Sequence, residues 1–162
     1  MERRAGDRPV PFGFALHPYF PYQGAREKTL LTVPAETRME ARDGLPSGKL
    51  LPVAGTPFDF RSPQPLSGKF LDDVFFGLKP EAPAKVEFLE IKRRLVFAAS
   101  ADFGHLVVWT PKDAPFFCIE NQTCSTDAHN LFAQGLRRES SLQVVAPGKT
   151  AGGQVELRIE RF

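Results

Sequence analysis

Short apolar runs separated by clusters of Gly, Pro and Asp recur along the whole chain and define its predicted elements. Runs of this kind, rich in aromatic and β-branched residues, are typical of strands, and the clusters between them of tight turns. We expect strands at residues 12–20, 28–33, 50–53, 71–76, 85–91, 94–100, 105–110, 115–123, 142–146 and 154–162. The rest of 36–60 carries turn residues, and only 125–136 has helical character. The pattern predicts a mainly β protein with a single domain over 1–162, whose polar lead at 1–11 we expect to be flexible.

The segment 115–123 combines a buried strand with a carboxylate at its end. Four apolar residues, 116–119, run directly into Glu120 and a polar cluster. An uninterrupted apolar run predicts a strand buried on both faces, so Glu120 is expected to be partly desolvated. Desolvation disfavours the charged carboxylate and makes it a stronger base, able to accept a proton from a bound hydroxyl near neutral pH. The alternative is a structural ion pair with an Arg or Lys, which also perturbs a carboxylate.

His17 lies directly before Pro18 in the first apolar run. A residue before Pro is held extended, and Pro has no N–H to continue a ladder, so the imidazole is presented at a fixed position. An imidazole that its surroundings hold charged can donate a proton near pH 7. The alternative is a histidine that hydrogen-bonds its own loop and packs among Tyr19 and Phe20.

Composition and charge exclude several classes of protein. Hydrophobic residues make up 42% of the 162 residues and charged ones 25%, which is typical of a globular chain. The net charge is +2 with both signs scattered, so we expect neither nucleic acid nor a membrane as partner. The charged N-terminus is not followed by an apolar segment, and we therefore expect a cytoplasmic protein. Cys118 and Cys124 are too few for a disulfide framework or a structural zinc site, and we expect two free thiols and no metal.

Five motifs together resemble the aldose 1-epimerase, or galactose mutarotase, family. They occur in the family's order and cover nearly the whole chain: His17-Pro18-Tyr19-Phe20; Asp43-Gly44-Leu45-Pro46-Ser47-Gly48 with Gly55-Thr56-Pro57-Phe58-Asp59-Phe60; Leu71-Asp72-Asp73-Val74-Phe75; Cys118-Ile119-Glu120 with Asp127-Ala128-His129-Asn130; and Ala146-Pro147-Gly148-Lys149-Thr150. The resemblance implies a large antiparallel β-sandwich of the galactose mutarotase-like (supersandwich) type, here a partial one. It also implies interconversion of the α and β anomers of a free aldose.

The resemblance implies roles for three residues. Glu120 would take the proton of the anomeric hydroxyl, His17 would protonate the ring oxygen, and Asp72 would bind sugar hydroxyls. One base and one acid that exchange roles suffice for ring opening and closure, so no cofactor is expected. Adjacent strand residues point to opposite faces, so at most one of Asp72 and Asp73 faces a given pocket. For stacking on the sugar ring the candidates are Trp109, Phe75 and Tyr19, each of which also suits a core.

The chain departs from the family pattern in two ways. Asn121 stands where the family usually has Pro, and the chain resembles only the C-terminal half of a family member. Half a sandwich leaves sheet edges and apolar surface without partners, so we expect a second polypeptide or self-association to cover them. The alternatives to a mutarotase are a non-catalytic carbohydrate-binding module on the same scaffold and a structural remnant with neither property.

Overall fold

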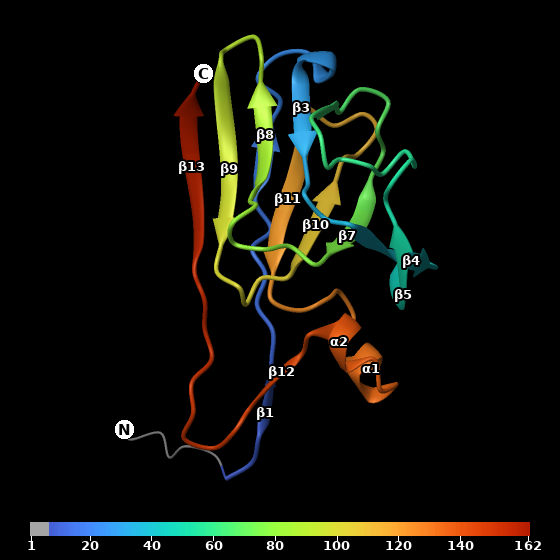
Figure 1. Cartoon of the computed structure of the whole chain (residues 1–162), viewed down its shortest axis with the longest axis vertical. Helices are drawn as coiled ribbons and strands as arrows, with labels where there is room; N and C mark the ends of the chain where they lie inside the picture. Colours follow the sequence, from blue (N-terminus) through green and yellow to red (C-terminus); the bar gives the residue numbers. More distant parts are fainter. Residues whose placement is uncertain (1–6) are drawn as a thin grey trace.

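The computed structural model describes residues 7–162, which form two packed antiparallel sheets and a separate two-stranded ribbon (Figure 1). One sheet has the strand order β2 (Tyr19–Pro21), β11 (Phe116–Gln122), β10 (His105–Trp109), β7 (Asp72–Phe76), β4 (Thr37–Arg42), β5 (Leu45–Pro52). The other has the order β13 (Val155–Arg161), β9 (Arg93–Ala99), β8 (Ala84–Phe88), β3 (Thr29–Thr32), β6 (Gln64–Pro65). The ribbon pairs β1 (Val10–Phe12) with β12 (Gln143–Val145), and three short helical turns complete the fold: η1 (Arg26–Lys28), α1 (Ala128–Ala133) and α2 (Arg137–Ser140). The prediction of an antiparallel β-sandwich is confirmed.

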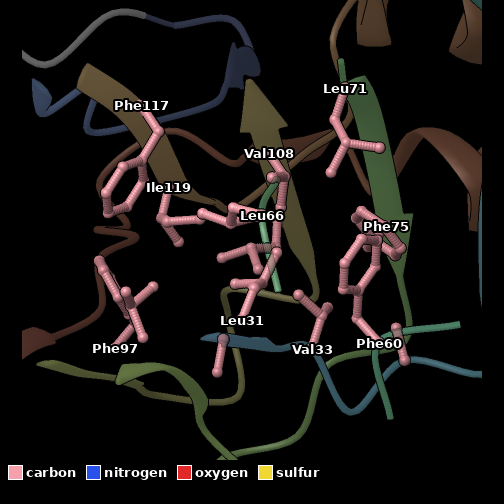
Figure 2. Close-up of a cluster of buried hydrophobic side chains, with 14 of the residues drawn as sticks. Leu31, Val33, Phe60, Leu66, Leu71, Phe75, Phe97, Val108, Phe117 and Ile119 are labelled. Carbon is pink, nitrogen blue, oxygen red and sulfur yellow. The ribbon is translucent and has the colours of Figure 1, made fainter. Parts of the chain in front are cut away.

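The main core lies between the two sheets, where aromatic and branched side chains from both interdigitate (Figure 2). Strand β11 contributes Phe117 and Ile119, and the facing sheet contributes Leu31 and Phe97, all at most 2% exposed. Successive strand residues point to opposite faces, so the residues between these, Cys118 included, belong to the outer face of the six-stranded sheet. That outer face carries a second, smaller apolar cluster, which the helical segment covers through Leu131. Strand β11 is therefore buried on both faces, as its apolar run predicts.

The structure corrects the expectation that residues 36–60 are mostly turns. Strands β4 and β5 form a hairpin in this region, joined by Asp43 and Gly44. Both residues have positive φ, 51° and 79°, as a two-residue type I′ hairpin loop requires. Asp-Gly between paired strands is a strong hairpin signal, but Pro and Gly inside β5 obscured it. Strand β5 ends the sheet order of the described residues, and an edge position tolerates Pro because one side of the strand has no ladder to break.

Two features of the strands differ from what the sequence suggests. The short connection at 100–104 suits a hairpin, yet β9 and β10 do not form one, because this connection carries the chain from one sheet to the other. The first apolar run is not one strand: β1 and β2 lie at its ends, and between them only Ala15 forms an isolated bridge, to Gln122. The end of the expected lead, at Val10 and Pro11, is paired in the ribbon, while residues 1–6 lie outside the described part of the chain. In residues 7–162 no helix is long and apolar enough to span a membrane.

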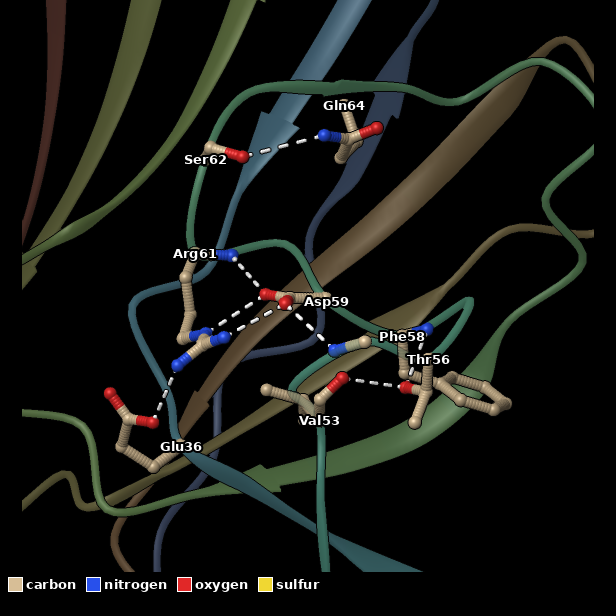
Figure 3. Close-up of polar contacts among 9 residues, drawn as sticks. Glu36, Val53, Thr56, Phe58, Asp59, Arg61, Ser62 and Gln64 are labelled. Carbon is tan, nitrogen blue, oxygen red and sulfur yellow. Dashed lines mark hydrogen bonds and ion pairs between the residues drawn. The ribbon is translucent and has the colours of Figure 1, made fainter.

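Asp59 stabilises the loop between β5 and β6 (Figure 3). Its carboxylate accepts hydrogen bonds from the backbone N–H groups of Gly55 (3.2 Å) and Arg61 (3.4 Å), the second of which closes an Asx turn. The guanidinium of Arg61 binds both Asp59 oxygens at 2.9 Å and reaches Glu36 at 2.8 Å. The hydrogen bonds from Arg61 hold the pKa of Asp59 well below its usual range. This network fixes the loop that follows the β4–β5 hairpin.

Candidate active site

His17 and Glu120 are in direct contact on the outer face of the six-stranded sheet. The distance from His17 Nε2 to Glu120 Oε1 is 3.2 Å. The two side chains come from segments about one hundred residues apart, and the fold brings them together as a cross-strand pair. The imidazole does pack on Tyr19, as the structural alternative expects, but its Nε2 meets the carboxylate of Glu120 on β11.

Backbone pairing on both sides of His17 sets this position. Ala15 is the register partner of Gln122, and Tyr19 is the register partner of Cys118. Midway between these pairs, His17 falls directly opposite Glu120. Pro18 follows it and has no N–H, so the ladder is interrupted here while both flanks remain paired. The imidazole is thereby held at a defined place although it lies outside a regular strand.

The flanks are further fixed by hydrogen bonds to the end of β11 and beyond. The N–H of Leu16 donates to the carbonyl of Asn121 at 3.3 Å. The backbone of Phe14 exchanges hydrogen bonds with Thr123, whose N–H donates to the Phe14 carbonyl at 2.9 Å and whose hydroxyl accepts from the Phe14 N–H at 2.8 Å. Thr123 is 3% exposed, so these bonds are protected from water. The strand that carries Glu120 thus also holds the segment that carries His17.

The two partners differ sharply in exposure. The Glu120 side chain is 7% exposed and that of His17 is 53% exposed. Burial raises the pKa of Glu120, an effect that the His17 charge and a hydrogen bond from Gln122 oppose and the nearby Asp72 charge reinforces. Gln122 Nε2 donates to Glu120 Oε2 at 3.4 Å, which leaves Oε1 directed at the imidazole. The result is a Glu120 carboxylate of raised basicity, in contact with a His17 imidazole that is open to solvent.

An aromatic wall borders the pair. The Tyr19 ring stacks on His17 with centroids 5.0 Å apart and planes 13° apart. Trp109 and Phe116 contact Tyr19 edge to face at 6.2 and 5.2 Å. Two of the three stacking candidates, Tyr19 and Trp109, therefore lie beside the pair. The third candidate, Phe75, points to the opposite face of the sheet, where it is 0% exposed in the core between the sheets. The expectation that Phe75 stacks on the sugar ring is therefore wrong.

Asp72 shares the face of Glu120. It is the register partner of Trp109, which is the partner of Cys118 on β11. With Val74, Val107 and others it lines a hollow of about 40 Å³, next to Glu120 because Val107 is the register partner of Glu120. Such a hollow has room for only a few water molecules, so a hexose would have to rest on the open face above it.

Asp73 points to the opposite face, as the alternation of strand residues predicts. Its carboxylate binds Arg38 Nη1 at 2.8 Å, with the two side chains 11% and 17% exposed. Burial raises the pKa of Asp73 and the Arg38 charge opposes that rise. Asp73 is thus part of the structural framework, and only Asp72 faces the candidate site.

The sequence interpretation overlooked two neighbours of Glu120. Cys118 is fully buried, and its sulfur, His17 Nε2 and a Glu120 oxygen lie within 4.8 Å of one another. Gln122 was given no role, yet it holds the second Glu120 oxygen. Both lie two residues from Glu120 on the same strand, so the period of two along a strand was the signal that could have found them.

The fold of the chain matches solved structures over about half of their length. A protein of Escherichia coli K12 provisionally named an aldose 1-epimerase has 21% identity and a TM-score of 0.79, over 98% of this chain and 53% of its own. A galactose mutarotase-like protein of Clostridium acetobutylicum has 17% identity and a TM-score of 0.80, over 98% and 50%. A galactose 1-epimerase of Lactobacillus acidophilus NCFM has 20% identity and a TM-score of 0.72, over 97% and 51%. These likenesses confirm the prediction of a partial sandwich of the galactose mutarotase-like type.

The family assignment comes from the sequence of the chain as a whole. No curated protein matches it. The profile of the aldose 1-epimerase family, however, matches residues 2–158. The match includes the segments that carry His17, Asp72 and Glu120. The chain therefore belongs to the aldose 1-epimerase family and spans about half the length of the solved structures it resembles.

Proposed function

We propose that this chain supplies the acid and base of an aldose mutarotase, interconverting the α and β anomers of a free hexose. The observation that carries the proposal is the 3.2 Å contact between His17 Nε2 and Glu120 Oε1 on an accessible face. The hydroxyl and ring oxygens that exchange protons in this reaction are bonded to one carbon. An acid and a base that serve both oxygens must therefore be neighbours themselves, as these two groups are.

The reaction starts with Glu120 ionised and His17 protonated. Glu120 takes the proton of the anomeric hydroxyl, the bond between the anomeric carbon and the ring oxygen breaks, and the ring oxygen takes a proton from His17. The product is the open-chain aldehyde, with Glu120 protonated and His17 neutral. Rotation about the bond next to the aldehyde exposes its other face, and closure returns both protons to their starting groups. The cycle consumes no other reactant.

The surroundings of the pair give the sugar a place to bind. Asp72 lies on the same face, where an ionised carboxylate accepts hydrogen bonds from sugar hydroxyls. Tyr19 and Trp109 give the site an apolar aromatic border. Because the hollow beside Asp72 is small, the sugar is expected to bind weakly and to stay largely open to solvent.

Polarimetry of freshly dissolved α-glucose or α-galactose tests the proposal. Glu120→Gln keeps the shape of the side chain and its contact with Gln122 but removes the base. Loss of a general base typically slows such a reaction by about 10²- to 10⁴-fold, so catalysed relaxation should fall to the spontaneous rate. Glu27→Gln, an exposed carboxylate on η1, is the matched control and should relax the sugar as the wild type does. Equal rates for wild type and Glu120→Gln would refute the catalytic proposal.

The alternative is a carbohydrate-binding module on the same scaffold. The open face and the small hollow beside Asp72 favour it, because they offer contacts without enclosing a substrate. Titration with galactose, followed by NMR of the protein and of the anomeric sugar protons, separates the two functions. Binding shifts without exchange between anomers would establish the module, and exchange that Glu120→Gln abolishes would establish the mutarotase.

We also propose that a second polypeptide or a second copy covers one side of the sandwich. Strand β13 ends the order of its sheet in the described chain, and its Ile159 and Leu157 are 74% and 44% exposed. A groove of about 340 Å³ between this edge and β2 is lined by apolar residues that include Phe20 and Ile159, together with Gln23, Arg93 and Arg94. Unpaired strand backbone beside apolar surface favours strand addition. Sedimentation and thermal melting of the isolated chain test this, and a monodisperse monomer that melts cooperatively would contradict it.

A further inference from the structure

We propose that His17, Cys118 and Glu120 form a binding site for a thiophilic divalent cation, with Zn²⁺ as the best match to the ligand set. Their ligand atoms, Nε2, Sγ and a carboxylate oxygen, lie within 4.8 Å of one another. Imidazole, thiolate and carboxylate are the three side-chain ligands that Zn²⁺ uses, whereas Mg²⁺ and Ca²⁺ take oxygen ligands. The donor set therefore selects the class of metal.

The distances fit one tetrahedral ion with a small adjustment. Bonds of about 2.0–2.1 Å at a tetrahedral angle place a nitrogen and an oxygen ligand about 3.3 Å apart. The observed separation of His17 Nε2 and Glu120 Oε1 is 3.2 Å, so these two atoms already stand at that spacing. A zinc–sulfur bond of about 2.3 Å would put the sulfur about 3.6 Å from either of them. Cys118 Sγ, within 4.8 Å of both, needs to approach by about 1 Å at most.

The backbone fixes the three ligands from two paired segments. Cys118 and Glu120 are two residues apart on β11 and point to the same face. His17 stands opposite Glu120, between the register pairs Ala15–Gln122 and Tyr19–Cys118. Ligands on paired backbone lose little conformational freedom when they bind, which favours a site that needs only side-chain motion.

The neighbours of the ligands support the same ion. Gln122 donates to Glu120 Oε2, the oxygen that does not face His17, and so orients Oε1 toward the cluster as an outer partner of a metal ligand does. The Asp72 carboxylate lies on the same face of the sheet, and its negative charge attracts a cation. His17 is half exposed, which gives the ion a path from solvent and leaves a fourth position for water.

Binding of the ion would have a consequence for the reaction, and this part rests on the proposed function. The ion would occupy Nε2 of His17 and Oε1 of Glu120, the two atoms that must exchange protons with the sugar. A metal-loaded site cannot hold those protons, so Zn²⁺ is expected to inhibit mutarotation competitively. His17 and Glu120 would then serve as the acid–base pair or, together with Cys118, as the metal site, but never as both at once.

Cobalt titration tests the site without reference to activity. Co²⁺ substitutes for Zn²⁺ and gives a thiolate-to-metal charge-transfer band in the near ultraviolet only when a cysteine is a ligand. We expect the band to saturate at one equivalent, and added Zn²⁺ to remove it. Cys118→Ser should abolish the band, whereas Cys124→Ser, which removes the other thiol, should keep it. No band in the wild type, or an equal band in Cys118→Ser, would overturn the proposal.

A second variant keeps the test valid if the buried Cys118→Ser chain folds poorly. His17→Gln changes a half-exposed side chain and is expected to keep the fold while weakening Co²⁺ at least tenfold. Unchanged affinity in this variant would also overturn the site. The outcomes separate the two proposals. Catalysed sugar relaxation without metal binding supports the mutarotase and refutes the metal site. Metal binding by a chain that does not catalyse sugar relaxation supports the metal site and refutes the mutarotase.

Discussion

His105 is a fully buried imidazole, and the fold should make the protein sensitive to acid through it. The residue is 0% exposed, and its ring packs on Phe76 with centroids 4.9 Å apart. Nε2 donates to the carbonyl of Glu139 at 3.0 Å, and Nδ1 meets no hydrogen-bonding partner among residues 7–162. Burial lowers the pKa of His105 from 6.5 to about 4, an effect that the hydrogen bond to Glu139 only partly offsets. The folded protein thus holds His105 neutral under conditions in which the unfolded chain would protonate it.

The size of the effect follows from these two pKa values. Above pH 6.5 the imidazole is neutral in both states and has no effect on the pH dependence of stability. As the pH falls from 6.5 toward 4 the unfolded chain binds the proton and the folded one does not, so stability is progressively lost. At about 1.4 kcal/mol for each pKa unit, the full loss is about 3 kcal/mol, of which about 2 kcal/mol is reached by pH 5. Below about pH 4 both states are protonated and the loss stops growing.

Urea unfolding at about pH 7.5 and about pH 5 measures this loss in the wild type and in His105→Gln. Gln does not titrate and keeps an N–H that can donate to the Glu139 carbonyl. The charge of Arg138, whose guanidinium lies 5.5 Å from the centre of the Phe76 ring, is present in both proteins. We expect the wild type to lose about 2 kcal/mol more than the variant between the two pH values. An equal loss in both proteins would show that the buried imidazole is not the acid-sensitive group.

Three other predictions concern stability and assembly. Phe117→Ala removes a ring that packs between the sheets and should lower the free energy of unfolding by about 3–5 kcal/mol in urea, with a small effect contradicting the core assignment. Arg38→Ala leaves Asp73 buried without its partner and should cost about 3–5 kcal/mol, while adding Asp73→Leu should recover much of it; strict additivity would argue against the pair. Ile159→Lys places a charge on the β13 edge, which should weaken association through that edge and lower the sedimentation coefficient. An unchanged sedimentation coefficient would show that the association surface does not include this edge.

The sequence predicted the sheets well where strand chemistry and burial agree. Strand β11 carries an apolar run that is buried on both faces, and its position was predicted from that run alone. Strand β5 was mostly missed because Pro46, Gly48 and Pro52 read as turn residues, yet an edge strand pairs on one side only and accepts them. Local propensity could not reveal this, because the position of a strand in its sheet is a property of the whole fold.

The candidate site was predictable in its residues but not in its geometry. The local sequence marked Glu120 and His17 as candidate acid–base residues, and the family resemblance added Asp72. That His17 stands directly opposite Glu120 depends on the register between segments about one hundred residues apart, which no local pattern encodes. The closeness of the buried Cys118 sulfur to His17 and Glu120 was missed for the same reason, since it depends on the segment that faces β11.

The placement of the acid and base also bears on what half a family member can do. Both groups belong to paired segments of one sheet, and the hydrogen bonds that hold them, from Leu16 and between Phe14 and Thr123, lie within this chain. Their contact therefore needs nothing from another polypeptide. Sugar affinity is different, because the face above Asp72 is open and its hollow is small. Contacts that bind the substrate and the transition state equally act on KM and not on kcat. Since the missing contacts are of this binding kind, we expect this chain alone to show a raised KM, and a partner that closes the face to act chiefly on KM.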